Sequence, residues 1–164
     1  MSAQSSVSGT ADVGTGFATH VAGDVVATHP FLMYPYSGVM IAAGAIVKGA
    51  VVTLTSQLPY TTGDLGPFGV ATAAIASGQD MASNVTGNCL LVFGRVYMNS
   101  GATIALGAFV VPSTGTNSTQ VVTVTTKYLS NCPTASIIMS GFIKPLGIAI
   151  TGVSGAGLFV MQLV

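Results

Sequence analysis

A strand pattern that occurs twice and contains almost no ionisable residues constrains the fold of this chain more than any other feature. In each round, a Gly-Ala-flanked apolar segment is followed by a Pro-x-Gly-aliphatic-Ala segment and then by a closing apolar segment. The three segments lie at residues 44–53, 67–71 and 90–96 in the first round and at residues 101–111, 145–149 and 158–164 in the second. Apolar, β-branched runs separated by Gly and Pro are typical of strands. The doubled pattern therefore predicts a small β-scaffold that binds surfaces and does not convert a substrate.

The chain from residue 38 onward predicts short strands and no long helix. Residues 119–126 alternate between apolar and polar side chains, as a half-buried strand does, and we expect them to form a hairpin with residues 109–111. Residues 153–157 are interpreted as a turn between two strands, and residues 71–76 are the one place where we expect a short helix. We predict about eight to eleven strands in one all-β core, a single small β-barrel or β-sandwich over residues 38–164.

Residues 1–37 are interpreted as an N-terminal extended arm followed by an irregular contact segment. Residues 1–16 are rich in Ser, Gly, Ala and Thr, a composition typical of an arm that orders on a neighbour. Prolines 30 and 35 exclude a regular helix or a central strand from the stretch that follows. Aromatic and Met side chains are enriched in interface cores, so we name four candidate partner contacts there: Phe31, Met33, Tyr34 and Tyr36. The alternative is a loop that packs on its own barrel.

The low charge of the chain bears on its partners. Only 5% of the residues are charged and the formal net charge is zero, against about 25% charged residues in a typical soluble domain; a net charge of zero favours association. Three explanations fit so few charges: the exterior is buried against other subunits, it contacts lipid, or it displays polar uncharged groups to water. We favour burial against other subunits. We do not expect nucleic-acid binding, because phosphate contacts need clustered positive charge. The basic residues stand singly in the sequence: Lys48, Arg95, Lys127 and Lys144.

Arg95 lies in an otherwise apolar strand, residues 92–98. An arginine in that setting reaches water, pairs with a carboxylate, or contacts a partner subunit. Because the chain has only four acidic residues, our hypothesis is that Arg95 pairs with an Asp at a subunit contact. Arg95 is therefore the fifth candidate partner contact.

The histidines do not indicate a metal site. A zinc site needs about three or four ligands, and only Asp24 lies near His20 and His29 in the sequence. We interpret both histidines as loop residues that pack or form hydrogen bonds. No metal is therefore expected.

The remaining reactive side chains do not indicate catalysis. Asp64 and Asp80 lie in turn-like contexts, where Asp bonds its own backbone, and Cys89 and Cys132 have no metal-ligand spacing and are interpreted as small buried residues. The chain has no Gly-x-Ser-x-Gly elbow and no phosphate-binding loop. We predict that the protein is not an enzyme and expect no catalytic residue and no cofactor.

Membrane insertion is one alternative, because residues 146–164 carry no charge. Four glycines, a Thr and a Ser interrupt this stretch, and its Ile, Val and Phe content suits strands better than a spanning helix. Residues 1–6 lack the basic and apolar regions of a secretory signal. We therefore expect no membrane association, and synthesis in the cytoplasm.

The order of the motifs resembles the small capsid cement, or decoration, proteins of tailed bacteriophages. The segments that carry the resemblance are Gly94-Arg95-Val96, Gly101 to Gly107 and Leu146-Gly147-Ile148-Ala149, and it covers roughly residues 38–164. It implies a non-enzymatic virion protein, made in the host cytoplasm, that sits on the outside of the assembled capsid, often as a homotrimer. Its partners would be the major capsid protein, whose neighbouring subunits it would staple together, and further copies of itself.

Two other functions share this composition. A receptor- or glycan-binding fibre-type β-domain would use exposed aromatic rings as sugar platforms. A membrane-associated β-protein would explain the hydrophobicity, but it needs strands of about 9–11 residues.

Overall fold

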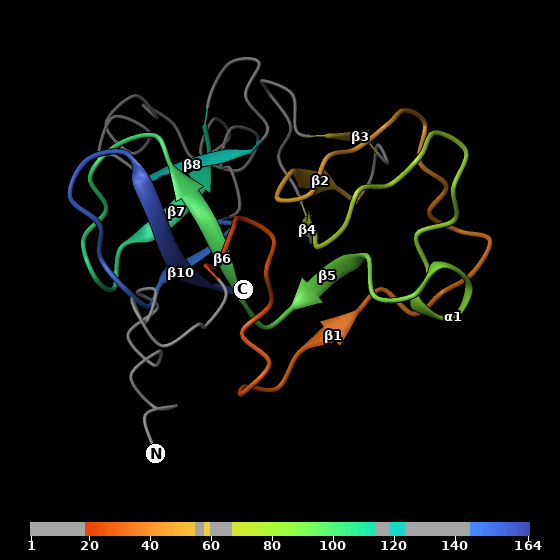
Figure 1. The fold of residues 1–164 in the computed structure, drawn as a ribbon, viewed down its shortest axis with the longest axis horizontal. Helices are drawn as coiled ribbons and strands as arrows, with labels where there is room; N and C mark the ends of the chain where they lie inside the picture. The colour runs from red at the N-terminus through yellow and green to blue at the C-terminus, as the bar shows by residue number, and fades with distance from the viewer. Residues whose placement is uncertain (1–18, 55–57, 60–66, 114–118, 124–144) are drawn as a thin grey trace, which may run out of the picture.

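A computed structural model describes residues 19–54, 58–59, 67–113, 119–123 and 145–164 of the chain. These residues form ten strands and one four-residue helix, arranged as a closed five-stranded barrel and a separate five-stranded sheet. The all-β prediction is confirmed. Figure 1 shows the barrel and the sheet side by side, with β5 leading directly into β6 at the junction between them.

The separate sheet is open and entirely antiparallel. Its strands, in spatial order, are β1 (Leu32–Met33), β5 (Leu90–Phe93), β4 (Phe68–Ala71), β2 (Val51–Thr53) and β3 (Leu58–Pro59). The two edge strands are only two residues long. The residues assigned to the irregular N-terminal section thus supply one edge of this sheet, and Val25 adds an isolated bridge to Val96 in the barrel.

The barrel closes through one parallel pair. Its strands, in order around the barrel, are β10 (Gly157–Leu163), β6 (Arg95–Ser100), β8 (Gln120–Thr123), β7 (Phe109–Pro112) and β9 (Gly147–Ala149). β6 and β8 are parallel, whereas the other neighbours are antiparallel. Closure leaves no free edge along these strands.

The doubled sequence pattern corresponds to two units with the same topology. In the first unit β2 pairs with β4 and β4 with β5, and in the second β7 pairs with β9 and β9 with β10. Each unit begins with the same isolated bridge, Ile46↔Ile75 in the first and Ile104↔Val153 in the second. The flanking strands also correspond, β3 to β8 and β1 to β6. The units differ in that β6 and β8 pair with each other, whereas β1 and β3 lie at opposite edges of the open sheet.

A tight turn directly precedes β2 in the first unit and β7 in the second. The N–H of Ala50 donates to the carbonyl of Val47 at 3.1 Å, and the N–H of Ala108 donates to that of Ala105 at the same distance. The third residue of each turn is a glycine with positive φ, +82° at Gly49 and +79° at Gly107. A turn of this kind requires φ above zero at that position, which glycine adopts without steric cost.

Two hydrophobic cores lie on opposite faces of the open sheet. Val51 belongs to the larger core, which also includes buried residues of the barrel, and the next residue, Val52, belongs to the smaller one. This alternation follows from the two-residue period of a strand. The smaller core is completed by residues from the loop before β2 and from the loop after β4: Met40, Ala42, Ile46, Ile75 and Met81. The larger core therefore joins the sheet to the barrel.

The structure confirms two local predictions and corrects a third. β7 and β8 form the predicted antiparallel hairpin, and residues 153–156 lie in the connection between the antiparallel strands β9 and β10, with Gly157 as the first residue of β10. The helix predicted over residues 71–76 is wrong, because Ala71 ends β4 and Ile75 forms a bridge with Ile46. The helix of the described residues is α1 (Ser83–Thr86). No helix in the described part of the chain is long and apolar enough to cross a membrane.

Candidate partner-contact surface

The segment around residues 29–32 runs alongside residues 93–95 at the junction of sheet and barrel. Arg95 Nη1 lies 2.8 Å from His29 Nε2, and Leu32 is the register partner of Phe93. Between these two contacts, Phe31 lies against Gly94. We call this surface the seam and define it by five residues: His29, Phe31, Leu32, Phe93 and Arg95.

Gly94 makes the close approach at the seam possible. Its φ is +127°, and a Cβ built on it would lie 2.6 Å from the Cβ of Phe31. A side chain at this position would therefore overlap Phe31 and would also strain the backbone. Since Gly94 joins β5 to β6, the same residue brings the end of the sheet next to the start of the barrel.

The seam is apolar and open to solvent. The exposed fractions are 51% for Leu32, 50% for Phe93 and 40% for Phe31. Single exposed apolar residues are ordinary on a protein surface, whereas adjacent large ones mark sites of interaction. Three large exposed side chains on two adjoining segments thus form a candidate contact surface.

Arg95 supplies the charge at the seam. Its Nε donates to Gln162 Oε1 at 3.4 Å, and its Nη1 donates to His29 Nε2. Because an arginine has no acceptor, His29 Nε2 must accept, which leaves the N–H on Nδ1, 3.1 Å from Thr28 Oγ1. His29 is therefore neutral in this arrangement, and no carboxylate of the described residues lies within 4 Å of Arg95.

The structure separates the five residues predicted as partner contacts. Phe31 and Arg95 lie in the seam. Met33 is only 7% exposed and belongs to the larger core, so it is not part of the accessible surface. The register of β1 against β5 shifts between Leu32 and Met33, so exposed Leu32 stands opposite Phe93 whereas buried Met33 stands opposite Leu91. Tyr34 is half-buried against the smaller core, and Tyr36 is 64% exposed with its ring 5.8 Å from that of Tyr34, edge to face.

The sequence analysis missed Leu32 and Phe93. Both lie in apolar runs, and among the described residues they belong to the pair of strands at one edge of the sheet, β1 and β5. A signal was present at Phe93, because a glycine follows it directly and interrupts the apolar strand.

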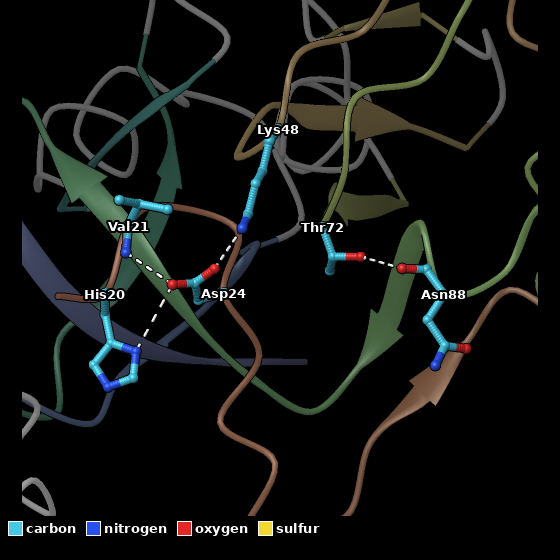
Figure 2. A network of polar contacts seen from close by, with 6 residues as sticks. All are labelled: His20, Val21, Asp24, Lys48, Thr72 and Asn88. Atoms are coloured by element: carbon cyan, nitrogen blue, oxygen red, sulfur yellow. Dashed lines mark hydrogen bonds and ion pairs between the residues drawn. The ribbon is translucent and has the colours of Figure 1, made fainter. Parts of the chain in front are cut away.

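A polar network ties residues 19–27 to the turn of the first unit (Figure 2). Asp24 accepts from Lys48 Nζ at 2.5 Å and from the N–H of Val21 at 2.9 Å, and His20 Nδ1 lies 3.7 Å from its carboxylate. The ring of His20 stacks on Tyr97 of β6 with 4.2 Å between centroids. The network thus connects β6 of the barrel with the turn that precedes β2.

The pKa values in this network follow from its contacts. Burial raises the pKa of Asp24, but the hydrogen bonds from Lys48 and Val21 and the charges of Lys48 and His20 outweigh it, so the net pKa is lowered. Burial raises the pKa of Tyr97, and the charge of Asp24 adds to this effect. Because the Asp24 carboxylate is held by Lys48 and by the N–H of Val21, we interpret the network as a clamp and not as a reactive site.

The other reactive side chains have structural roles where the structure describes them. Asp80 accepts from the backbone N–H of Gly38 at 2.7 Å and of Ala82 at 3.0 Å, which confirms the turn interpretation. Cys89 is buried, as predicted. Asp64 and Cys132 lie outside the described residues. The described residues contain no group of three or more His, Cys, Asp or Glu side chains that could hold a metal ion.

Comparison with known protein families, with curated proteins and with solved structures finds no match. The functional argument therefore rests on the residues and geometry of this chain.

Proposed function

We propose that this chain is a structural virion protein, a capsid decoration protein that binds the outside of an assembled shell and staples neighbouring major capsid subunits. The observation that carries the proposal is the seam, where exposed Leu32 and Phe93 adjoin an arginine with no acidic partner among the described residues. Aromatic residues and arginine dominate the energetics of protein interfaces. A surface of this kind on an almost uncharged all-β body supports binding to another protein.

The proposal includes a homotrimer and a non-enzymatic role on the virion surface. The low charge of the chain supports self-association, because few like charges oppose contact between copies. Repeated attachment points on a shell then add by multivalency, so each single contact can be modest. Light scattering coupled to gel filtration tests this part: a discrete mass of three chains is expected, and a stable monomer contradicts it.

A receptor- or glycan-binding fibre-type domain is the second candidate. Tyr36 favours it, because this ring is 64% exposed and is oriented by its edge-to-face contact with Tyr34. An exposed, oriented aromatic ring can stack on a sugar. Substitution of Tyr36 by Ala would abolish glycan binding if this candidate is correct.

The deciding experiment is co-sedimentation of the purified protein with shells assembled from the coat protein encoded in the same genome. We expect saturable binding of the wild type, loss of binding in Phe93→Ser, and wild-type binding in Phe109→Ser. Phe93 and Phe109 are exposed to nearly the same extent, 50% and 52%, but Phe109 lies in β7 and outside the seam, so it is the matched control. A wild-type protein that stays in the supernatant contradicts the proposal.

A further inference from the structure

The position of Arg95 is fixed before any partner arrives. It is half-buried at the start of β6 and is the register partner of Gln162 in β10. The contacts with His29 and Gln162 occupy Nη1 and Nε. The other guanidinium N–H donors have no partner among the described residues, and they form part of a fork that matches a carboxylate.

The described carboxylates are already engaged elsewhere. Asp24 is bound by Lys48 and by the N–H of Val21, and Asp80 accepts two backbone N–H groups. Moving either one to Arg95 would break contacts that hold the fold together. A carboxylate for Arg95 is therefore more readily supplied by another protein than by the described residues of a second copy.

The rest of the seam defines what would surround that carboxylate. Leu32 is paired with Phe93 across β1 and β5, and Phe31 directly precedes Leu32 in the sequence. No other charge lies in the seam, because His29 accepts a hydrogen bond from Arg95 and is neutral in that role. Apolar side chains next to the carboxylate would cover these three residues and exclude water, which strengthens the ion pair.

We propose that the seam docks a segment of a different protein that presents one carboxylate to Arg95, with apolar side chains on both sides of it. This inference rests on the proposed function, under which the segment belongs to a subunit of the shell. Recognition is preorganised, because His29 and Gln162 already hold the guanidinium and little side-chain entropy remains to be lost.

A peptide titration tests the proposal without a capsid. The ¹⁵N-labelled full-length protein is titrated with acetyl-Leu-Phe-Asp-Leu-Leu-amide and, separately, with the same peptide carrying Asn in place of Asp. We expect saturable shifts of the Arg95 Nε–H and Gly94 N–H resonances, with a dissociation constant in the range of about 1–10 mM for the Asp peptide. Binding of the Asn peptide should be about tenfold weaker, since it lacks the charge-assisted hydrogen bond.

Variants separate the charge from the apolar contacts. Arg95→Gln should reduce the affinity for the Asp peptide about tenfold and abolish the preference over the Asn peptide. Phe93→Ser should weaken both peptides alike. Leu106→Ser removes an equally apolar, 73% exposed residue from the turn before β7 and should bind as the wild type does. The two-peptide comparison on the wild type needs no variant to fold.

Equal affinity for the two peptides, or no shift at the seam with either, overturns the proposal. Shifts of the same resonances that appear on concentrating the protein alone also overturn it, because a second copy would then occupy the seam. Selective binding of the Asp peptide by a protein that ignores shells would refute only the decoration function. Shell binding that Arg95→Gln leaves unchanged would refute only the carboxylate assignment.

Discussion

The two units share one topology, but one closes into a barrel and the other stays open. In the second unit the flanking strands β6 and β8 are six and four residues long and pair with each other. In the first unit the corresponding strands β1 and β3 are two residues each and lie at opposite edges. Closure therefore depends on the flanking strands and not on the repeated motif.

Prolines account for the short strands of the open unit. Pro30 and Pro35 stand on either side of β1, and Pro59 lies within β3. A proline has no N–H to donate to a strand ladder, so it confines a strand to the edge of a sheet or ends it. The seam lies at this short edge strand, where Leu32 and its partner Phe93 are exposed.

The two units also differ in what covers their equivalent faces. Strand register aligns Val51 with Phe109 and Leu91 with Gln162. Val51 and Leu91 are fully buried in the core that joins sheet and barrel, whereas Phe109 is 52% exposed and Gln162 is half-buried. One face of the repeat thus serves as an internal interface in the first unit and as molecular surface in the second.

The largest predicted difference between the units concerns that face. Leu91→Ala should lower the free energy of unfolding by about 3 kcal/mol, because it leaves a cavity in the joining core. Gln162→Ala, at the equivalent position of the barrel, should cost less than about 1 kcal/mol. Urea unfolding followed by circular dichroism measures both. Similar losses at the two positions would contradict the assignment of the two faces.

The glycine of each Pro-x-Gly segment, Gly69 or Gly147, lies close to the backbone of a neighbouring strand. A Cβ on Gly147 would overlap the carbonyl oxygen of Gln162, and one on Gly69 would lie 2.9 Å from the carbonyl oxygen of Leu91. Backbone atoms in a closed barrel cannot move aside, so Gly147→Ala should cost about 3 kcal/mol and Gly69→Ala about 1–2 kcal/mol. The same unfolding measurement applies, and a larger cost at Gly69 would mean that the open sheet is the more rigid unit.

The two turn glycines, Gly49 and Gly107, differ in their surroundings. Gly107→Ala meets no atom within 4 Å and should cost only the backbone strain at φ +79°, about 1 kcal/mol. Gly49→Ala adds a contact of 2.9 Å with the Cβ of Ala22 and should cost about 2 kcal/mol. Thermal unfolding of the two variants side by side tests this order. Equal melting temperatures would show that residues 19–27 do not press on the turn of the first unit.

The sequence predicted the repeated elements better than their long-range pairing. Residues with a strong local signal formed the expected strands, as in the β7–β8 hairpin. The helix expected at residues 71–76 failed because the bridge between Ile46 and Ile75 overrides the helix propensity of the alanines. Local sequence says nothing about which strand lies beyond β5, and this pairing decides that Met33 is buried.

The candidate surface was predictable only in part for the same reason. Phe31 was found because it lies in an aromatic, Met-containing segment between two prolines, and Arg95 because it interrupts an otherwise apolar strand. Leu32 and Phe93 were hidden among apolar residues that are mostly buried. Their position at the surface depends on the pairing of Leu32 with Phe93, which lie 61 positions apart in the sequence, and no local pattern encodes that pairing.

The smallest predicted effect concerns the clamp between the barrel and the turn of the first unit. Asp24 has a lowered pKa in the folded state, so the unfolded chain takes up a proton at this group first as the pH falls. The clamp therefore contributes stability above the ordinary pKa of an aspartate, about 3.9, and loses it as the pH falls below that value. Asp24→Asn should flatten the decline in unfolding free energy between about pH 4 and pH 2. The difference should be at most about 1 kcal/mol, because the pair is partly exposed and screened.

Lys48→Met is the matched variant, since it leaves Asp24 in place and should shrink the same decline. Parallel pH profiles for all three proteins would mean that the clamp adds nothing to stability, and that the joining core alone holds the closed unit to the open one.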